Sequence, residues 1–300
     1  MKTQLFTEAK DFQIGDQGQS VANLQNYLDR LGYLPKGRLL TAGSLSIFTS
    51  DVVSAVRKYQ RFFGLPASGV VDEATRQMME MPRCGNTDLD DGEEAHPAGV
   101  ASFVASGGKW STNAITYRFV RGTQDLIGDA EFSLVRQAFA VWAAVTPLTF
   151  SEVSGAAPAD LLISWESADH GDGSSFDGPG HTLAHAFFPP PINPSPGIAG
   201  DLHFDESETW GSGHGGGMID LLSVAIHELG HALGLSHSNV ASAIMFPTYN
   251  GIKRTLDPDD IQGIQSIYGA PGSGGGPPPP KKLSFLEQLI ELIRKLFGGK

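Results

Sequence analysis

The stretch HELGHALGLSH, His227 to His237, decides how the second half of this chain is interpreted. On a helix, His227 and His231 share one face, so both imidazoles can bind a single metal ion. Glu228 follows the first histidine, where its carboxylate can reach a water molecule on that ion. Gly234 can adopt a left-handed conformation that ends the helix and turns the chain. His237 can then return as a third ligand and leave one zinc position open, as hydrolytic zinc sites require.

The length of this motif argues against a chance match. A short H-E-x-x-H pattern is common, and its plain interpretation is a helix with surface histidines. The longer H-E-x-x-H-x-x-G-x-x-H pattern fixes five positions, which disfavours that interpretation. Met245 stands eight residues after His237, within the turn-prone AIMFPTY. We expect this methionine to pack in the core beneath the metal ligands.

The chain contains a single cysteine, Cys84, within MPRCGNTD, residues 81–88. A lone cysteine forms no intramolecular disulfide and does not reveal the redox compartment. A thiolate is a soft zinc ligand, so Cys84 could fill the open fourth position of the metal site. The alternative is an incidental surface thiol.

The zinc motif and the downstream methionine resemble the metzincin peptidases. The PRCGNTD segment resembles the cysteine switch of the matrixins, the matrix metalloproteinase family. The similarity extends over nearly all of residues 12–270 and is closest to plant-type and related members that lack a haemopexin-like propeller. The resemblance implies that Cys84 excludes the catalytic water in a latent form. It also implies that Arg83 and Asp88 brace the switch segment.

Two residues of the switch depart from the family pattern. Asn86 and Thr87 stand where Val-Pro is more common, so we expect a less pre-organised switch. The connector over residues 85–102 is also long and acidic, so we expect a zymogen that activates readily, by an organomercurial or by slow self-cleavage between about residues 90 and 103. Phe103 would then be the new N-terminus, with Asp259 or Asp260 as a partner for its amine.

The resemblance implies further metal sites in the loops of the second half. A closed structural zinc site would use His170, Asp172, His185 and His203. One calcium site would use Asp177, Gly178, Gly180, Thr182, Asp205 and Glu208. A second, weaker calcium site would use Asp160, Gly197, Ala199 and Asp201. Oxygen ligands suit calcium, and the plain alternative is a set of polar surface loops. We interpret the remaining histidines as solvated: His96, His181 and His214.

Patterning divides the chain into five segments. They are a helical prodomain with the switch (1–88), an activation linker (89–102), a catalytic domain (103–270), a Gly/Pro linker (271–280) and an amphipathic helix (281–300). The expected fold class is α+β, and the metzincin resemblance implies a twisted, mostly parallel sheet and three helices in the catalytic domain. Residues 12–81 predict three helices, with N-caps at Ser20 and Asp72. They resemble a peptidoglycan-binding-like fold, which we interpret as a spacer or prodomain.

Composition narrows the possible partners. The net charge of −12 argues against nucleic-acid binding. The first twenty residues show no apolar core of a signal peptide, yet the resemblance implies a secreted protein. Residues 281–300 carry an apolar stripe and a net charge of +3. That helix could meet a membrane surface, associate with itself or dock on its own chain.

The predicted function is that of a zinc endopeptidase made as a latent zymogen, with protein or peptide substrates. By resemblance, Glu228 takes a proton from the attacking water and delivers it to the leaving amine. An edge strand near GIAGD, residues 197–201, would hold the substrate. The substrate pocket would be lined by Ser223, Met245, Pro247 and Tyr249. The alternatives are a cell-wall-binding protein with an inert zinc domain, and a zinc hydrolase that acts on non-peptides.

Overall fold

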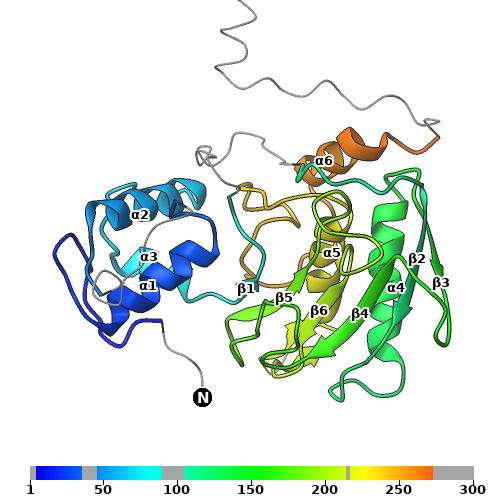
Figure 1. Ribbon diagram of the computed structural model, residues 1–300, viewed down its shortest axis with the longest axis horizontal. Coiled ribbons are helices and arrows are strands. Elements are labelled where there is room, and N and C mark those ends of the chain that lie inside the picture. The colour runs from blue at the N-terminus through cyan, green and yellow to red at the C-terminus, as the bar shows by residue number, and fades with distance from the viewer. Residues whose placement is uncertain (1–4, 36–45, 90–104, 214–216, 273–300) are drawn as a thin grey trace, which may run out of the picture.

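The computed structural model describes residues 5–35, 46–89, 105–213 and 217–272. Figure 1 shows an N-terminal helical part and a larger α/β part. Each part has its own hydrophobic core. Most of the two predicted linkers (residues 90–102 and 273–280) and the predicted helix over residues 281–300 lie outside the described residues. In the described part of the chain, no helix is both long and apolar enough to cross a bilayer.

Three helices form the N-terminal part: α1 (Gln19–Arg30), α2 (Ser50–Phe62) and α3 (Glu73–Met79). The predicted N-cap of α3 is confirmed, because the Asp72 side chain accepts a hydrogen bond from the Thr75 backbone. The predicted cap at Ser20 is wrong. Helix α1 begins one residue earlier, after Gly18, and the buried Ser20 hydroxyl instead accepts a bond from Thr7 N at 3.1 Å.

The α/β part contains a twisted, mostly parallel sheet, as the metzincin resemblance implies. Its strands are β2 (Ala114–Phe119), β3 (Thr149–Glu152), β4 (Leu161–Glu166), β5 (Thr182–Ala186) and β6 (Leu202–Asp205). The strand order is β1-β5-β6-β4-β2-β3, and only β5 and β6 pair antiparallel. Strand β1 (Arg83–Cys84) comes from the N-terminal part of the chain and adds to the β5 edge.

Three helices accompany this sheet: α4 (Ala130–Ala143), α5 (Leu221–Ala232) and α6 (Pro258–Tyr268). Helices α4 and α5 pack closely, and the buried Trp142 indole donates to Ile226 O at 2.9 Å. Helix α5 begins at Leu221. Ile219 and Asp220 form strand β8 with β7 (Trp210–Gly211), and the Asp220 side chain caps the helix by accepting from Ser223 N.

The prediction that an edge strand near residues 197–201 holds the substrate is wrong. Residues 197–201 form a turn that leads into β6, and β6 is an interior strand between β5 and β4. Next to the metal site, the strand that pairs with an added peptide is β5, whose other edge pairs with β6. The structure fills the outer edge of β5 with β1.

Candidate metal centre

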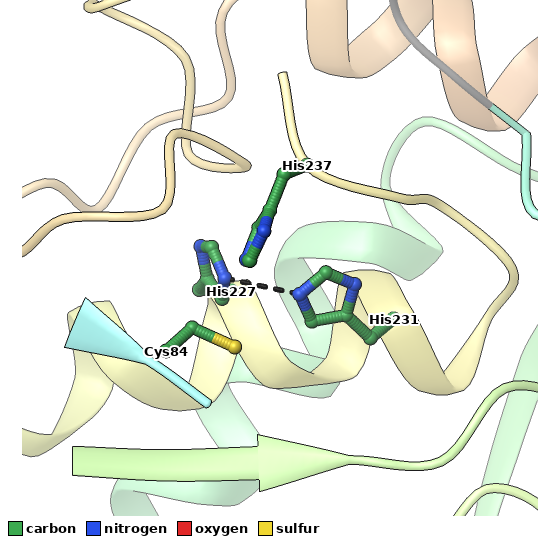
Figure 2. A group of neighbouring side chains, drawn as sticks. All are labelled: Cys84, His227, His231 and His237. Atoms are coloured by element: carbon green, nitrogen blue, oxygen red, sulfur yellow. Dashed lines mark hydrogen bonds between the residues drawn. The ribbon is translucent and has the colours of Figure 1, made fainter. Parts of the chain in front are cut away.

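Helix α5 carries two of the histidines, one turn apart on one face (Figure 2). The helix ends at Ala232, and Gly234 follows with φ of 104°. A side chain at Gly234 would place a Cβ 2.5 Å from the carbonyl oxygen of Gly108, so glycine is required for both conformation and space. The chain then reverses and brings His237 back over the helix face.

The four predicted ligand side chains converge. One ligand atom each from Cys84, His227, His231 and His237 lies within 4.8 Å of the others, and all four residues are buried. Figure 2 shows the thiol on β1 facing the three imidazoles across the site. The sequence separation between Cys84 and the histidines is more than 140 residues, so only the fold could bring them together.

The ring hydrogen bonds show that a cation fits here. Nδ1 of His227 donates to Ile244 O and Nδ1 of His231 donates to Leu235 O, each at 2.7 Å. Because a carbonyl only accepts, both protons sit on Nδ1 and both Nε2 atoms present lone pairs. Those two Nε2 atoms are 3.2 Å apart. Two facing lone pairs repel, and a zinc ion between them would turn the repulsion into coordination.

The electrostatics of the site agree with this assignment. Burial lowers the pKa of His227 to about 3 and keeps the pKa of His231 and His237 below the ordinary histidine value. The imidazoles are therefore neutral, the form that binds metals. Burial, and then the neighbouring Glu228, raise the pKa of the Cys84 thiol well above its ordinary value. A thiolate at this position thus requires a nearby cation.

Glu228 lies beside the thiol and points into the site. Its Oε2 accepts from Cys84 Sγ at 3.5 Å, and its other carboxylate oxygen is buried without a hydrogen-bond partner. Burial raises the pKa of Glu228 to about 8. A buried carboxyl with a raised pKa next to a metal site is suited to taking and returning a proton.

Met245 lies under the ligand helix. A Cβ placed on Gly230 would lie 2.2 Å from the Met245 sulfur, so the thioether packs directly against α5 between the two histidine turns. Asp260 on α6 holds this turn, because its carboxylate accepts from Ile244 N at 2.8 Å and Met245 N at 3.1 Å. The predicted pocket residue Met245 does not line the neighbouring cavity.

That cavity, of about 40 Å³, lies next to His227 and Glu228 and includes the other three predicted pocket residues, Ser223, Pro247 and Tyr249. The Ser223 hydroxyl donates to Asp220 at 2.6 Å and accepts from Lys253 N at 2.9 Å. The small serine therefore also fixes the loop that closes the pocket.

The switch segment lies in a groove between β5 and residues 247–249. On one side, Arg83 N donates to His181 O at 2.7 Å and Gly85 N to Ala184 O at 2.8 Å. On the other side, Cys84 N donates to Pro247 O at 2.9 Å, and a backbone bond of 2.7 Å joins Tyr249 N to Pro82 O. The segment is thus bound as an extended peptide with hydrogen bonds along both edges.

A buried ion pair supports this segment. Arg83 and Asp88 pair with each other, and both side chains are almost fully buried. Asp88 also accepts from the Tyr33 hydroxyl at 2.8 Å and lies 2.8 Å from Nδ1 of His237. Burial alone would raise the pKa of Asp88, but Arg83 and then His237 lower it to about 2. The sequence did not indicate the contacts of Asp88 with Tyr33 and His237, because both join residues far apart in the chain.

The second histidine cluster also converges. Asp172 Oδ2 lies 2.7 Å from His170 Nε2 and 2.8 Å from both His185 Nε2 and His203 Nδ1. His185 on β5 and His203 on β6 are register partners, so the sheet brings these two rings together. Burial would raise the pKa of Asp172, but hydrogen bonds from His185 and other donors hold it below its ordinary value. Three nitrogens and one carboxylate match a closed zinc site.

The first set of predicted calcium residues lies in two adjoining loops. Asp177 accepts from Thr182 N at 3.0 Å, and Glu208 accepts from Gly180 N at 2.5 Å. Asp205 is fully buried, and one of its carboxylate oxygens has no hydrogen-bond partner. Burial, together with nearby Asp177, raises the pKa of Asp205. A buried, partly unpaired carboxylate among other acidic groups fits a cation, although these side chains converge less tightly than the two histidine clusters.

The second set of predicted calcium residues is only partly brought together. Asp160, Gly197 and Ala199 line a cavity of about 350 Å³. Asp201 does not line it; its carboxylate accepts from Leu162 N at 3.0 Å, and burial raises its pKa to about 6. Asp160 already accepts two bonds from Thr116, at 2.8 and 2.7 Å.

His181, expected to be solvated, is half-buried. Its ring Nε2 is buried without a hydrogen-bond partner, at a cavity between α1 and the Asp177 loop. The reason is that β1 docks beside it, through the bond from Arg83 N to His181 O. His96 and His214 lie outside the described residues.

The site combines three histidines with an adjacent carboxylate, and a thiol of the same chain closes it. This arrangement is typical of a metallopeptidase-like centre that its own chain blocks. Comparison with known proteins gives the family. The Matrixin family model matches residues 109–269, and the peptidoglycan binding domain model matches residues 17–79. The chain belongs to the matrixin family.

Individual relatives agree with this assignment. Matrilysin of Rattus norvegicus is 40% identical over 248 residues, which cover 82% of this chain and 84% of the relative. Matrix metalloproteinase-16 of Homo sapiens is 42% identical over 264 residues, and Stromelysin-1 of Equus caballus is 39% identical over 262 residues. The match covers 83% and 85% of this chain but only 42% and 50% of those relatives.

Proposed function

We propose that this protein is a zinc-dependent endopeptidase, made as a latent zymogen, that cleaves peptide bonds of extracellular proteins outside the cell. One observation carries the proposal. An extended segment of the chain itself, Pro82 to Gly85, lies across the metal site with its backbone paired on both sides. A groove that binds one peptide in this way is built to bind another. Membership of the matrixin family supports the same conclusion.

Each part of the site has a role in this reaction. His227, His231 and His237 would hold the catalytic zinc, which when bound supplies Lewis acidity to the peptide carbonyl and to water. Strand β5 and residues 247–249 orient the substrate backbone. Once Cys84 has withdrawn, Glu228 takes the proton of the attacking water and returns it to the leaving amine.

The other metal sites have structural roles in this proposal. His170, Asp172, His185 and His203 would hold a structural zinc. Calcium would bind at the Asp177 and Asp205 loops and more weakly near Asp160. For the freed amine of Phe103, the contacts favour Asp259 over Asp260. One buried oxygen of Asp259 has no partner, whereas Asp260 already holds the Met245 turn.

The alternative of a cell-wall-binding protein with an inert zinc domain is not favoured. The Glu228 carboxylate is present, buried and in contact with Cys84 at the metal site, which an inert domain would not require. The test is digestion of a peptide library by the processed protein, with and without a zinc chelator. We expect cleavage that the chelator abolishes and added zinc restores. Chelator-resistant cleavage, or none by zinc-loaded protein, would contradict the proposal.

The same digest tests the specificity pocket. Because Ser223 is small, we expect a preference for Leu, Met or large aromatic residues directly after the cleaved bond. Replacing Ser223 by Leu would fill the pocket and reduce cleavage before such residues by roughly 10- to 200-fold, the range for changed pocket contacts of this size. Ser223→Ala, which keeps the pocket wide, is the matched control. A wild-type enzyme that accepts only Ala or Gly there would refute the pocket assignment.

Residues 281–300 stay a separate prediction. Their apolar stripe consists of Leu286, Leu289, Ile290, Ile293, Leu296 and Phe297. Flotation with anionic liposomes and size measurement, each with and without residues 271–300, separate the two proposed roles. Loss of flotation on truncation indicates membrane binding, and a smaller particle indicates self-association. If neither changes, docking on its own chain is the interpretation that stands.

A further inference from the structure

Asn86 makes contacts that the sequence does not suggest. It lies two residues after the blocking thiol, at a position where the matrixin resemblance leads one to expect a valine. Its side-chain amide donates to Ala186 O at 2.7 Å, and Ala186 N donates back to its Oδ1 at 3.1 Å. One amide group thus satisfies both backbone groups of a single β5 residue, as a paired strand residue would.

These two bonds continue the pairing of the switch segment with β5. Residues 184 and 186 direct their backbone groups toward the outer edge of β5, because residues two apart in a strand face the same way. Gly85 N donates to the carbonyl of Ala184, and the Asn86 side chain bonds to both the N–H and the carbonyl of Ala186. The backbone after Gly85 turns away toward Asp88, so only a side chain of this length and chemistry keeps the edge covered.

The same contacts position the thiol. The Asn86 backbone N–H donates to Cys84 Sγ at 3.4 Å. The two hydrogen bonds to Ala186 hold the Asn86 side chain in place. They thereby also keep the Asn86 backbone N–H directed toward the sulfur. Asn86 therefore both covers the peptide-binding edge and holds the sulfur in place.

We propose that Asn86 is a positioning residue for latency: its side chain imitates a bound peptide backbone at Ala186 and keeps the switch segment closed. This deepens, and rests on, the proposed zymogen function. It also reverses the sequence-based expectation that Asn86 loosens the switch relative to valine, because valine has no group that could bond to Ala186.

The test measures how often the switch opens, without using activity. Full-length, zinc-loaded protein is mixed with a thiol reagent, and the rate of Cys84 labelling is followed by mass spectrometry of the uncleaved chain. We expect Asn86→Ala to label faster by roughly 5- to 100-fold, as the loss of two ordinary hydrogen bonds predicts. Asn86→Asp keeps the shape of the side chain but places a carboxylate oxygen against Ala186 O, where the two oxygens repel. Its thiol should be labelled at least as fast as that of Asn86→Ala. Thr87→Ala, at the exposed neighbouring residue, is the matched control and should label like wild type.

Processing removes residue 86 together with the prodomain, so the processed variants should be identical proteins. This provides an internal control. After processing, all variants should have the same kcat/KM, so that hydrolysis by the processed protein tests the proposed function independently of Asn86. Equal labelling rates for wild type, Asn86→Ala and Asn86→Asp would overturn the proposal, as would a wild-type thiol that already reacts like a free one. Unchanged thermal unfolding of the variants would show that faster labelling reflects local opening.

Discussion

Replacing Glu228 by glutamine should leave the metal bound and lower peptide hydrolysis by the processed protein by on the order of 10²- to 10⁴-fold, the usual contribution of general acid–base catalysis. The amide has nearly the shape of the carboxylate but cannot take a proton from water. Zinc should stay because the converging ligand atoms come from three histidines and, in the latent form, Cys84. The measurements are kcat/KM and the zinc content of each sample.

The matched control for this variant is Glu152→Gln. Glu152 is on β3, at the far edge of the sheet, and pairs with Arg136, so its loss should leave turnover unchanged. A Glu228→Gln protein that holds a full equivalent of zinc and turns over at a near-native rate would exclude Glu228 as the proton acceptor.

Replacing Cys84 by serine should make the full-length protein active, or self-processed, as purified. A hydroxyl stays protonated where a thiol next to a cation ionises, so serine is a weak ligand for the fourth position. Loss of a contact to a charged group corresponds to roughly a 10- to 150-fold larger open population. The measurement is the initial rate of peptide cleavage by uncleaved chain, before any activator is added.

The structure sharpens this prediction, because the thiol also contacts the catalytic carboxylate at 3.5 Å. Withdrawal of Cys84 therefore frees both the metal and Glu228. Thr87→Ser, in the same segment but exposed, should keep the wild-type basal rate. Equal basal rates for wild type and Cys84→Ser would mean that Cys84 does not block the site and that the N-terminal part has another role.

The chemistry of the site could be predicted because it depends on local geometry. The four-residue spacing of His227 and His231 puts two rings on one helix face in any context, and Gly234 allows the turn that returns His237. Strand alternation and helical periodicity likewise indicated strands and helices in the second half and a helical N-terminal part, whereas the mostly parallel sheet was implied only by the family resemblance. Such patterns concern residues within a few turns of one another, and the sequence displays them directly.

The tertiary structure alone decided which distant groups meet. Nothing near GIAGD shows that it leads into an interior strand, because edge or interior position depends on the pairing of β6 with both β5 and β4. The contact of Asn86 with Ala186 spans 100 residues, and that of Asp88 with His237 joins the two halves of the chain. From the sequence, Asn86 was expected to weaken the switch, because the sequence does not show its hydrogen-bond partner across the groove. Long-range register is set by packing of the whole fold, and a single sequence does not display it.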